Sequence, residues 1–190
     1  MRGFLLNLMA VVGILGATLL TPVQAAPDVD DALSSVKKMV GLIRYGKNDL
    51  ALKSIGLPQA TAYLMGSYHG QATLDQLGQI EGLLGEYLKV SAFPLARKYF
   101  EDIDLSYDKP VVKGDAVHIR ASLLYGGSEQ IKFTWVVVES DGEYVVTDFL
   151  DDRNQSSLKA SRDKQIQKVL QRKGIPGLIK AMETAVEKAR

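Results

Sequence analysis

The chain has 190 residues, with 23 Lys and Arg against 22 Asp and Glu, no Cys and two His. The balanced charge argues against nucleic acid as a partner, because neutralising phosphates requires a large basic surplus. Without Cys there are no disulfides, thiolate metal ligands, cysteine nucleophiles or lipoprotein acylation. His69 and His118 are too few for a metal site built on imidazole, and we expect no metal and no cofactor.

The N-terminal segment has the pattern of a secretory signal peptide. Arg2 precedes residues 4–20, of which 13 of 17 are apolar, and Val23 and Ala25 fit the positions before a cleavage site. The alternative is an uncleaved membrane anchor, but a span needs about 20 apolar residues. We therefore expect cleavage after Ala25, which leaves residues 26–190 as one domain. Absence of Cys from an exported protein of this size fits the periplasm.

Three or four helices are expected first. Residues 28–45 place Leu33, Val36, Val40 and Ile43 on one stripe, which predicts an amphipathic helix. A second short helix is expected within residues 46–56. A third begins at Pro58, because Pro is favoured in the first turn of a helix.

The longest helical stretch is expected over residues 72–100. Thr73 and Gln76 have the spacing of a capping box. Pro94 is expected to kink or break the helix, because proline lacks a backbone donor and clashes with the preceding turn. Each interior glycine costs about 1 kcal/mol relative to Ala, but allows a backbone or a ligand chain to come close. These glycines are Gly78, Gly82 and Gly85.

The apolar period then changes from 3.6 to 2, which indicates strands. Three or four strands are expected: a candidate short strand over residues 102–107, and three longer ones over residues 116–125, 131–139 and 144–150. Asp141-Gly142 is a strong hairpin signal. Two helices follow, over residues 157–170, ending near Gly174, and 176–188. The order predicts an α+β fold, with an antiparallel sheet of three to four strands and helices from both ends of the chain.

The charge is unevenly distributed along the mature chain. Residues 26–152 hold 12 basic and 19 acidic side chains, a net charge of −7, whereas residues 153–190 hold 10 basic and three acidic, a net charge of +7. The two halves can simply be solvated helix faces. Alternatively, the basic end is a patch for anionic head groups or for an acidic docking partner.

Catalytic motifs are weak. Residues 41–48 are similar to a P-loop, but Asn48 stands where the motif needs Ser or Thr, and a helical pattern rather than a strand precedes it. Gly46 is therefore interpreted as a helix C-cap. Asp148 has the strand parity of Val146 and Leu150, so it is either a buried general base or a carboxylate that hydrogen-bonds to a neighbouring helix. His118 lies opposite the apolar row of its strand. An enzyme using Asp148 or His118 is therefore an alternative hypothesis.

The C-terminal half resembles a known family. The residues that carry the resemblance stand in order: Trp135, residues 141–148, Ser157-Leu158, Arg162 and residues 174–179. This order is similar to that of the Mla C component family of bacterial periplasmic phospholipid-binding proteins, also called the toluene-tolerance auxiliary family. The resemblance covers residues 28–188. Tyr144 stands where Trp is common, and residues 152–155 replace a shorter link.

The resemblance implies a cone-shaped fold similar to nuclear transport factor two, in which helices wrap a curved sheet around an apolar pocket. It also implies a monomeric carrier without enzymatic activity. Such a carrier moves phospholipid between an outer-membrane lipoprotein–porin complex and an inner-membrane ABC transporter with MCE domains, in retrograde trafficking that maintains outer-membrane lipid asymmetry. A hopanoid or other hydrophobic cargo, and an adaptor whose groove binds a protein segment, are alternatives.

A soluble lipid carrier must enclose the acyl chains. Exposing a 16-carbon tail to water costs on the order of 12 kcal/mol, at about 0.8 kcal/mol per CH₂. A smooth apolar lining is therefore required, and Arg162 is a candidate for contacting the head group. The expected lining residues, which could equally form an ordinary core, are Leu84, Tyr87, Leu88, Val117, Ile119, Leu123, Phe133, Trp135, Val146 and Leu150.

Overall fold

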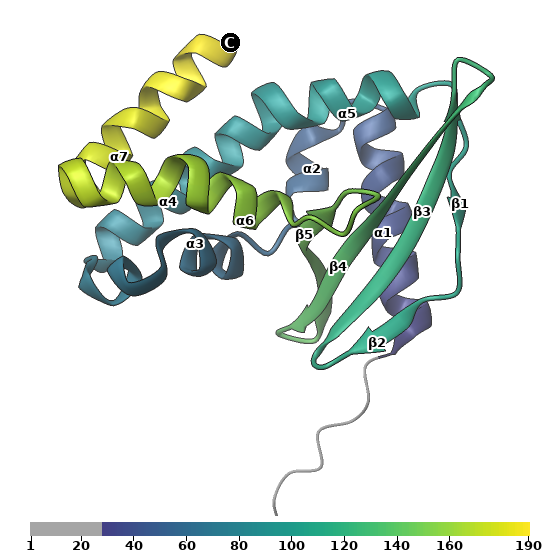
Figure 1. Cartoon of the computed structure of the whole chain (residues 1–190), viewed down its shortest axis with the longest axis horizontal. Helices are drawn as coiled ribbons and strands as arrows, with labels where there is room; N and C mark the ends of the chain where they lie inside the picture. The colour runs from purple at the N-terminus through teal and green to yellow at the C-terminus, as the bar shows by residue number, and fades with distance from the viewer. Residues whose placement is uncertain (1–27) are drawn as a thin grey trace, which may run out of the picture.

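The computed structural model describes residues 28–190, and the expected signal peptide of residues 1–25 lies outside the described residues. Helices come first, then an antiparallel sheet, then helices (Figure 1), which confirms the α+β class. Before the sheet stand α1 (Val29–Arg44), α2 (Asn48–Leu52), α3 (Leu57–Met65), the 3₁₀ helix η1 (Gly66–Gln71), α4 (Leu74–Tyr87), the π-helix η2 (Leu88–Ala92) and α5 (Phe93–Phe100).

The sheet has five strands, two of them short. They are β1 (Ser106–Tyr107), β2 (Val111–Lys113), β3 (Ala116–Tyr125), β4 (Glu129–Ser140) and β5 (Glu143–Leu150). β1 and β2 both pair with β3, which pairs with β4, which pairs with β5. The three long strands match the expected ones, and Asp141 and Gly142 both have positive φ, as a type I′ hairpin turn requires.

The strand expected over residues 102–107 is mostly absent. Arg44 of α1 explains this, because its guanidinium donates to the carbonyl of Ile103 at 2.8 Å and pairs with Asp104 at 3.2 Å. These contacts hold the start of the segment against α1, so that only its last two residues, Ser106–Tyr107, pair with β3. Strand β2, which the alternation did not predict, pairs with the other half of β3.

The expected disruption at Pro94 takes the form of a π turn. Pro94 lies in the first turn of α5, and η2 directly precedes that helix. The residues on either side of η2, Tyr87 and Phe93, keep right-handed helical dihedrals, so the chain stays helical from α4 to α5. A π turn alters the local hydrogen-bond pattern, which accommodates a ring that cannot donate.

The C-terminal helices are α6 (Ser157–Ser161), the π-helix η3 (Arg162–Ile166) and α7 (Gln167–Ala189). The helix boundary expected near Gly174 is present as a kink inside α7, where Gly174 adopts φ 63° and ψ −168°. This conformation is essentially restricted to glycine. No helix within residues 28–190 is both long and apolar enough to cross a bilayer.

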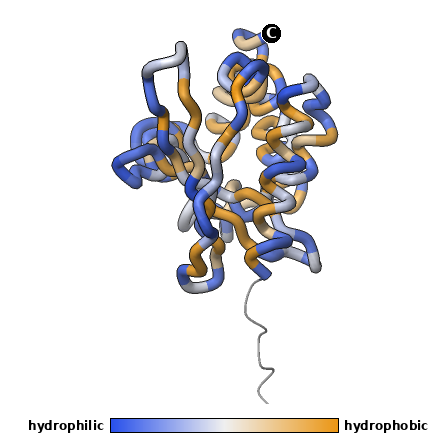
Figure 2. Tube along the Cα trace, turned by 90° about the vertical axis from the view of Figure 1, so that its right-hand side faces the viewer, coloured by the Kyte–Doolittle hydropathy of each residue, from blue (hydrophilic) through white to orange (hydrophobic). Residues whose placement is uncertain are grey.

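Two separate hydrophobic clusters support the fold. The larger joins α1 to one face of the sheet, which we call the inner face; its members include Val36 and Met39 of α1 and Val117, Ile119 and Val137 of the sheet. The smaller joins α3, α4 and α7, and consists of Met65, Ile80, Leu170, Ile175 and Leu178. Hydrophobic and hydrophilic stretches alternate along the helices (Figure 2), as amphipathic helices require.

Candidate functional site

Aromatic side chains form the centre of the inner face. The rings of Phe133, Trp135 and Phe149 lie with centroids 5.0 to 5.4 Å apart, in stacked and edge-to-face arrangements. Cross-strand pairing produces this cluster, because Trp135 of β4 lies opposite Phe149 of β5. Phe149 is only half-buried, so the cluster extends from the core toward the edge of the sheet.

The indole nitrogen of Trp135 has no hydrogen-bond partner among the described residues. Trp135 is 7% exposed, and its Nε1 is fully buried. The hydroxyl of Thr61, on α3, is likewise buried without a partner there. A buried polar group without a protein partner costs free energy. The interior around the sheet is therefore not a purely hydrocarbon core.

Six of the expected lining residues lie together in the larger cluster. They are Val117, Ile119, Leu123, Phe133, Trp135 and Val146. Leu88 of η2 is half-buried and packs against them, whereas Leu84 of α4 is half-buried and Tyr87 is 41% exposed. The structure therefore brings the expected lining residues of the sheet together. Of the expected lining residues on the helices, Leu88 packs against this cluster. Ligand contact at these positions remains a prediction.

The close approach expected at the glycines of α4 occurs at Gly85. A Cβ at Gly85 would lie 3.0 Å from Leu52 and 3.3 Å from Leu57, so α2 and α3 both pack against this position. Gly78 and Gly82 have nothing within 4 Å of the corresponding point. Gly85 therefore serves helix packing beside Leu84 and Leu88.

A β-bulge changes the expected geometry of β5. Val146 pairs with Val137 and Asp148 pairs with Val136, which leaves Thr147 as an extra residue. Asp148 and Leu150 therefore lie on the face opposite Val146, and the expectation that the three share a face is wrong. Phe149 takes the inner-face position instead. Simple alternation could not identify Phe149, because the bulge reverses the parity.

Asp148 ties the end of β5 to the start of α6. Its Oδ1 accepts hydrogen bonds from the hydroxyl of Ser157 at 2.9 Å and from the backbone N–H groups of Leu158 at 3.0 Å and Phe149 at 2.7 Å. Ser156 caps the same helix by accepting from the N–H of Lys159. The interpretation of Asp148 as a carboxylate bonded to a neighbouring helix is thus confirmed.

His118 lies on the same face as Asp148, away from the aromatic cluster. Val136 pairs with both residues and stands between them, so they are two strand spacings apart, or roughly 10 Å. That separation is too large for direct proton transfer. Burial, and then the positive charge of Lys113, lowers the pKa of His118.

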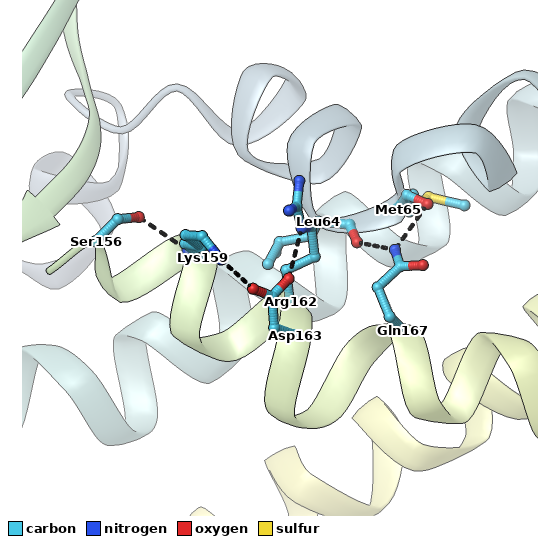
Figure 3. A network of polar contacts seen from close by, with 7 residues as sticks. All are labelled: Leu64, Met65, Ser156, Lys159, Arg162, Asp163 and Gln167. Carbon is cyan, nitrogen blue, oxygen red and sulfur yellow. Dashed lines mark hydrogen bonds and ion pairs between the residues drawn. The ribbon is translucent and has the colours of Figure 1, made fainter.

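Arg162 extends from η3 toward α3 (Figure 3). Its guanidinium carbon lies 4.5 Å from the centroid of the Tyr63 ring, and its Nε lies 3.0 Å from Asp163. Gln167, one turn later, donates to the carbonyls of Leu64 and Met65 at 2.8 and 3.0 Å. Arg162 is therefore held in place at the contact between η3 and α3, but it lies apart from the aromatic cluster.

Two open hollows lie near the β4–β5 turn. They have volumes of about 290 and 520 Å³, and polar residues such as Gln59, Ser140 and Lys38 contribute to their linings. No expected lining residue contributes to either hollow. The hollows therefore lack the apolar lining that acyl chains need.

Within residues 28–190, no three His, Asp or Glu side chains gather in a way that could hold a metal ion.

Residues 39–184 match the model of a protein family that is described as MlaC protein. The chain belongs to the MlaC family. Its fold is similar to that of a solved structure described as the phospholipid-binding protein from Ralstonia solanacearum in complex with a phospholipid. The two structures match with a TM-score of 0.70 and 19% sequence identity. The match covers 86% of this chain and 99% of that chain. No match was found among curated proteins.

Membership of the MlaC family confirms the resemblance inferred from the C-terminal half. One departure from the family pattern, Tyr144, has a structural role in this chain. Its hydroxyl accepts from the backbone N–H of Asp28, and its carbonyl accepts from the Ser35 hydroxyl at 2.6 Å. Tyr144 therefore fixes the start of α1 to β5, which keeps α1 across the inner face of the sheet.

Proposed function

We propose that this MlaC-family chain is a periplasmic carrier that encloses the acyl chains of a phospholipid between the inner face of the sheet and the helices. Family membership is the observation that carries the proposal, and the similar Ralstonia solanacearum structure, described as a phospholipid complex, supports it. The expected cleaved leader supports export to the periplasm.

The entry route for the acyl chains in this proposal is the half-buried apolar zone beside the larger cluster. Leu52, Ile55, Leu88 and Phe149 all pack against that cluster without being fully buried. An acyl chain can replace contacts among such side chains at little cost, because apolar contacts are non-directional. The buried Nε1 of Trp135 offers a donor to an ester oxygen of the cargo.

The carrier is proposed to pass phospholipid between an outer-membrane lipoprotein–porin complex and an inner-membrane ABC transporter with MCE domains. In this role the domain acts as a monomer that diffuses between the membranes and needs no catalytic group. Asp148 supports this view, because its Oδ1 is engaged by three donors at the start of α6.

Native mass spectrometry of the purified protein tests the cargo. We expect a bound phospholipid; a bound hopanoid would support the alternative cargo.

Trp135 is the only tryptophan, so brominated acyl chains should quench the fluorescence of the protein, whereas unbrominated lipid should not. Leu88→Asn should reduce lipid retention, and the control Leu74→Asn, at an 86% exposed position, should not. No bound lipid and no quenching at saturating lipid would overturn the proposal.

A further inference from the structure

The C-terminal helices carry a basic surface that the lipid-carrier role does not account for. Residues 164–182 contain five basic residues and no acidic residue. The five are Lys164, Lys168, Arg172, Lys173 and Lys180, and all are exposed. We call the first three, Lys164, Lys168 and Arg172, the basic face. Within residues 28–190, none of the five has a carboxylate within ion-pairing distance, in contrast to Lys159 and Arg162, which pair with Asp163.

Helix geometry concentrates three of these charges. Lys164, Lys168 and Arg172 are spaced four residues apart, so they lie along one side of η3 and α7, while Leu170 on another side is buried in the smaller cluster. Like charges at this spacing repel each other and destabilise the helix. Since no carboxylate of the described chain offsets this repulsion, the arrangement suits an anion outside the molecule.

The net charge of the chain also changes sign between the C-terminal helices and the rest of the mature sequence. Helix α7 lies on the opposite side of the molecule from strands β1 to β3 (Figure 1). Residues 153–190 carry a net charge of +7, whereas residues 26–152 carry −7. Exposed acidic residues of the sheet end include Glu101, Asp102 and Asp104. Near an anionic surface, this separation would turn the basic face toward that surface.

We infer that the basic face docks the molecule on the anionic surface of a phospholipid bilayer. An acidic protein fits less well, because protein interfaces have an apolar or aromatic core. None of the exposed large hydrophobic side chains of the described chain lies within residues 153–190, and the aromatic one shown against these helices, Tyr63 of α3, lies against the Arg162 guanidinium. Lipid phosphates need no such core, and lysine and arginine beside an anionic leaflet are attracted by charge alone. The inference goes beyond the carrier proposal and does not depend on it.

Sedimentation of the full exported chain with lipid vesicles tests the inference. We expect binding to vesicles of phosphatidylcholine with 30% phosphatidylglycerol, and none to phosphatidylcholine alone. The combined change Lys164→Gln, Lys168→Gln and Arg172→Gln should weaken binding roughly 100-fold. A matched control, Lys109→Gln, Lys113→Gln and Lys132→Gln, removes the same charge from exposed positions on the sheet side and should change binding by less than about threefold.

Three further measurements keep the test decisive. Binding of the unmodified protein should fall steeply between 50 and 500 mM salt, and this needs no variant. A flat salt dependence, or equal weakening by both triple variants, would overturn the inference. Binding to polyglutamate but to neither kind of vesicle would identify an acidic protein as the partner and would also overturn it. Lipid retention measured by mass spectrometry should be unchanged in the triple variant, which separates this test from that of the carrier.

Discussion

At the scale of single residues, Thr147 determines the composition of the inner face. Its extra place in β5 turns Phe149 inward and Asp148 outward. One residue therefore completes the aromatic cluster with Phe133 and Trp135 and, at the same time, places a carboxylate where it can accept from the start of α6. The same bulge separates Asp148 from the apolar interior, where a buried general base would have to lie.

Two glycines of α4 should respond in opposite directions to the same change. Gly82→Ala should raise the free energy of unfolding by about 0.5–1 kcal/mol, because the position is open and alanine favours the helix. Gly85→Ala should lower it, because the added Cβ would meet Leu52 at 3.0 Å and Leu57 at 3.3 Å. Urea denaturation of both variants provides the measurement, and equal effects of the two changes would contradict the packing at Gly85.

His118 should make stability depend on pH. Its pKa is lowered in the folded protein, so below pH 6.5 the unfolded chain binds the proton more readily. The corresponding stability is present above pH 6.5 and is lost as the pH falls through the folded pKa. Denaturation at pH 7.5 and pH 5 should show a smaller pH-dependent loss for His118→Gln than for the unmodified protein. An identical loss in both proteins would argue against a lowered pKa.

At the scale of elements, each C-terminal helix is joined to an earlier part of the chain by polar contacts. Asp148 joins β5 to α6, and Gln167 joins α7 to the end of α3, where Gly66 ends the helix with φ 57°. These contacts satisfy backbone groups that helix ends leave without partners. Short polar links thus hold α6 against the end of β5 and the start of α7 against α3.

Replacing Asp148 tests the link between β5 and α6. Asp148→Ala should lower the free energy of unfolding by about 1–3 kcal/mol, because two backbone N–H groups and the Ser157 hydroxyl lose their acceptor. Asp148→Asn retains an oxygen acceptor and should cost less. Thermal melts of both variants measure the difference. If Asp148→Asn left stability unchanged but abolished a measurable turnover, the enzyme hypothesis would replace the structural role.

At the scale of the whole molecule, the two hydrophobic clusters are distinct, with half-buried residues such as Leu52, Ile55 and Leu88 beside the larger one. A protein with two such clusters can admit an apolar chain beside one of them without unfolding the other. In the proposed carrier, this arrangement allows loading and release while the helices α3, α4 and α7 remain packed together.

Lipid removal tests this arrangement. A ligand that binds only the folded state adds stability of RT ln(1 + [L]/Kd), which is about 2.7 kcal/mol at 100 times Kd. Extracting the bound lipid should therefore lower the melting temperature and increase the binding of a hydrophobic dye. Adding phospholipid back should reverse both changes. A protein that melts at the same temperature with and without lipid would contradict a cargo held within the fold.

The family was indicated by the resemblance of motifs in the C-terminal half. Local patterns predicted the succession of helices, sheet and helices, the three long strands, the Asp141-Gly142 turn and the capping box at Thr73. These features depend on apolar period, turn chemistry and capping, which act between residues close in the chain. The capping box is present in the structure, with reciprocal hydrogen bonds between Thr73 and Gln76.

Three other features follow from contacts made in the folded chain: the face that each residue of β5 occupies, the removal of residues 103–104 from the sheet by Arg44, and the close packing of Gly85 in α4. Each depends on a partner far away in sequence: the register with Val136 and Val137, the carbonyl of Ile103, and the side chains of Leu52 and Leu57. Local periodicity carries no information about such pairings. Long-range packing therefore selected Phe149 for the inner face and removed Leu150 from it.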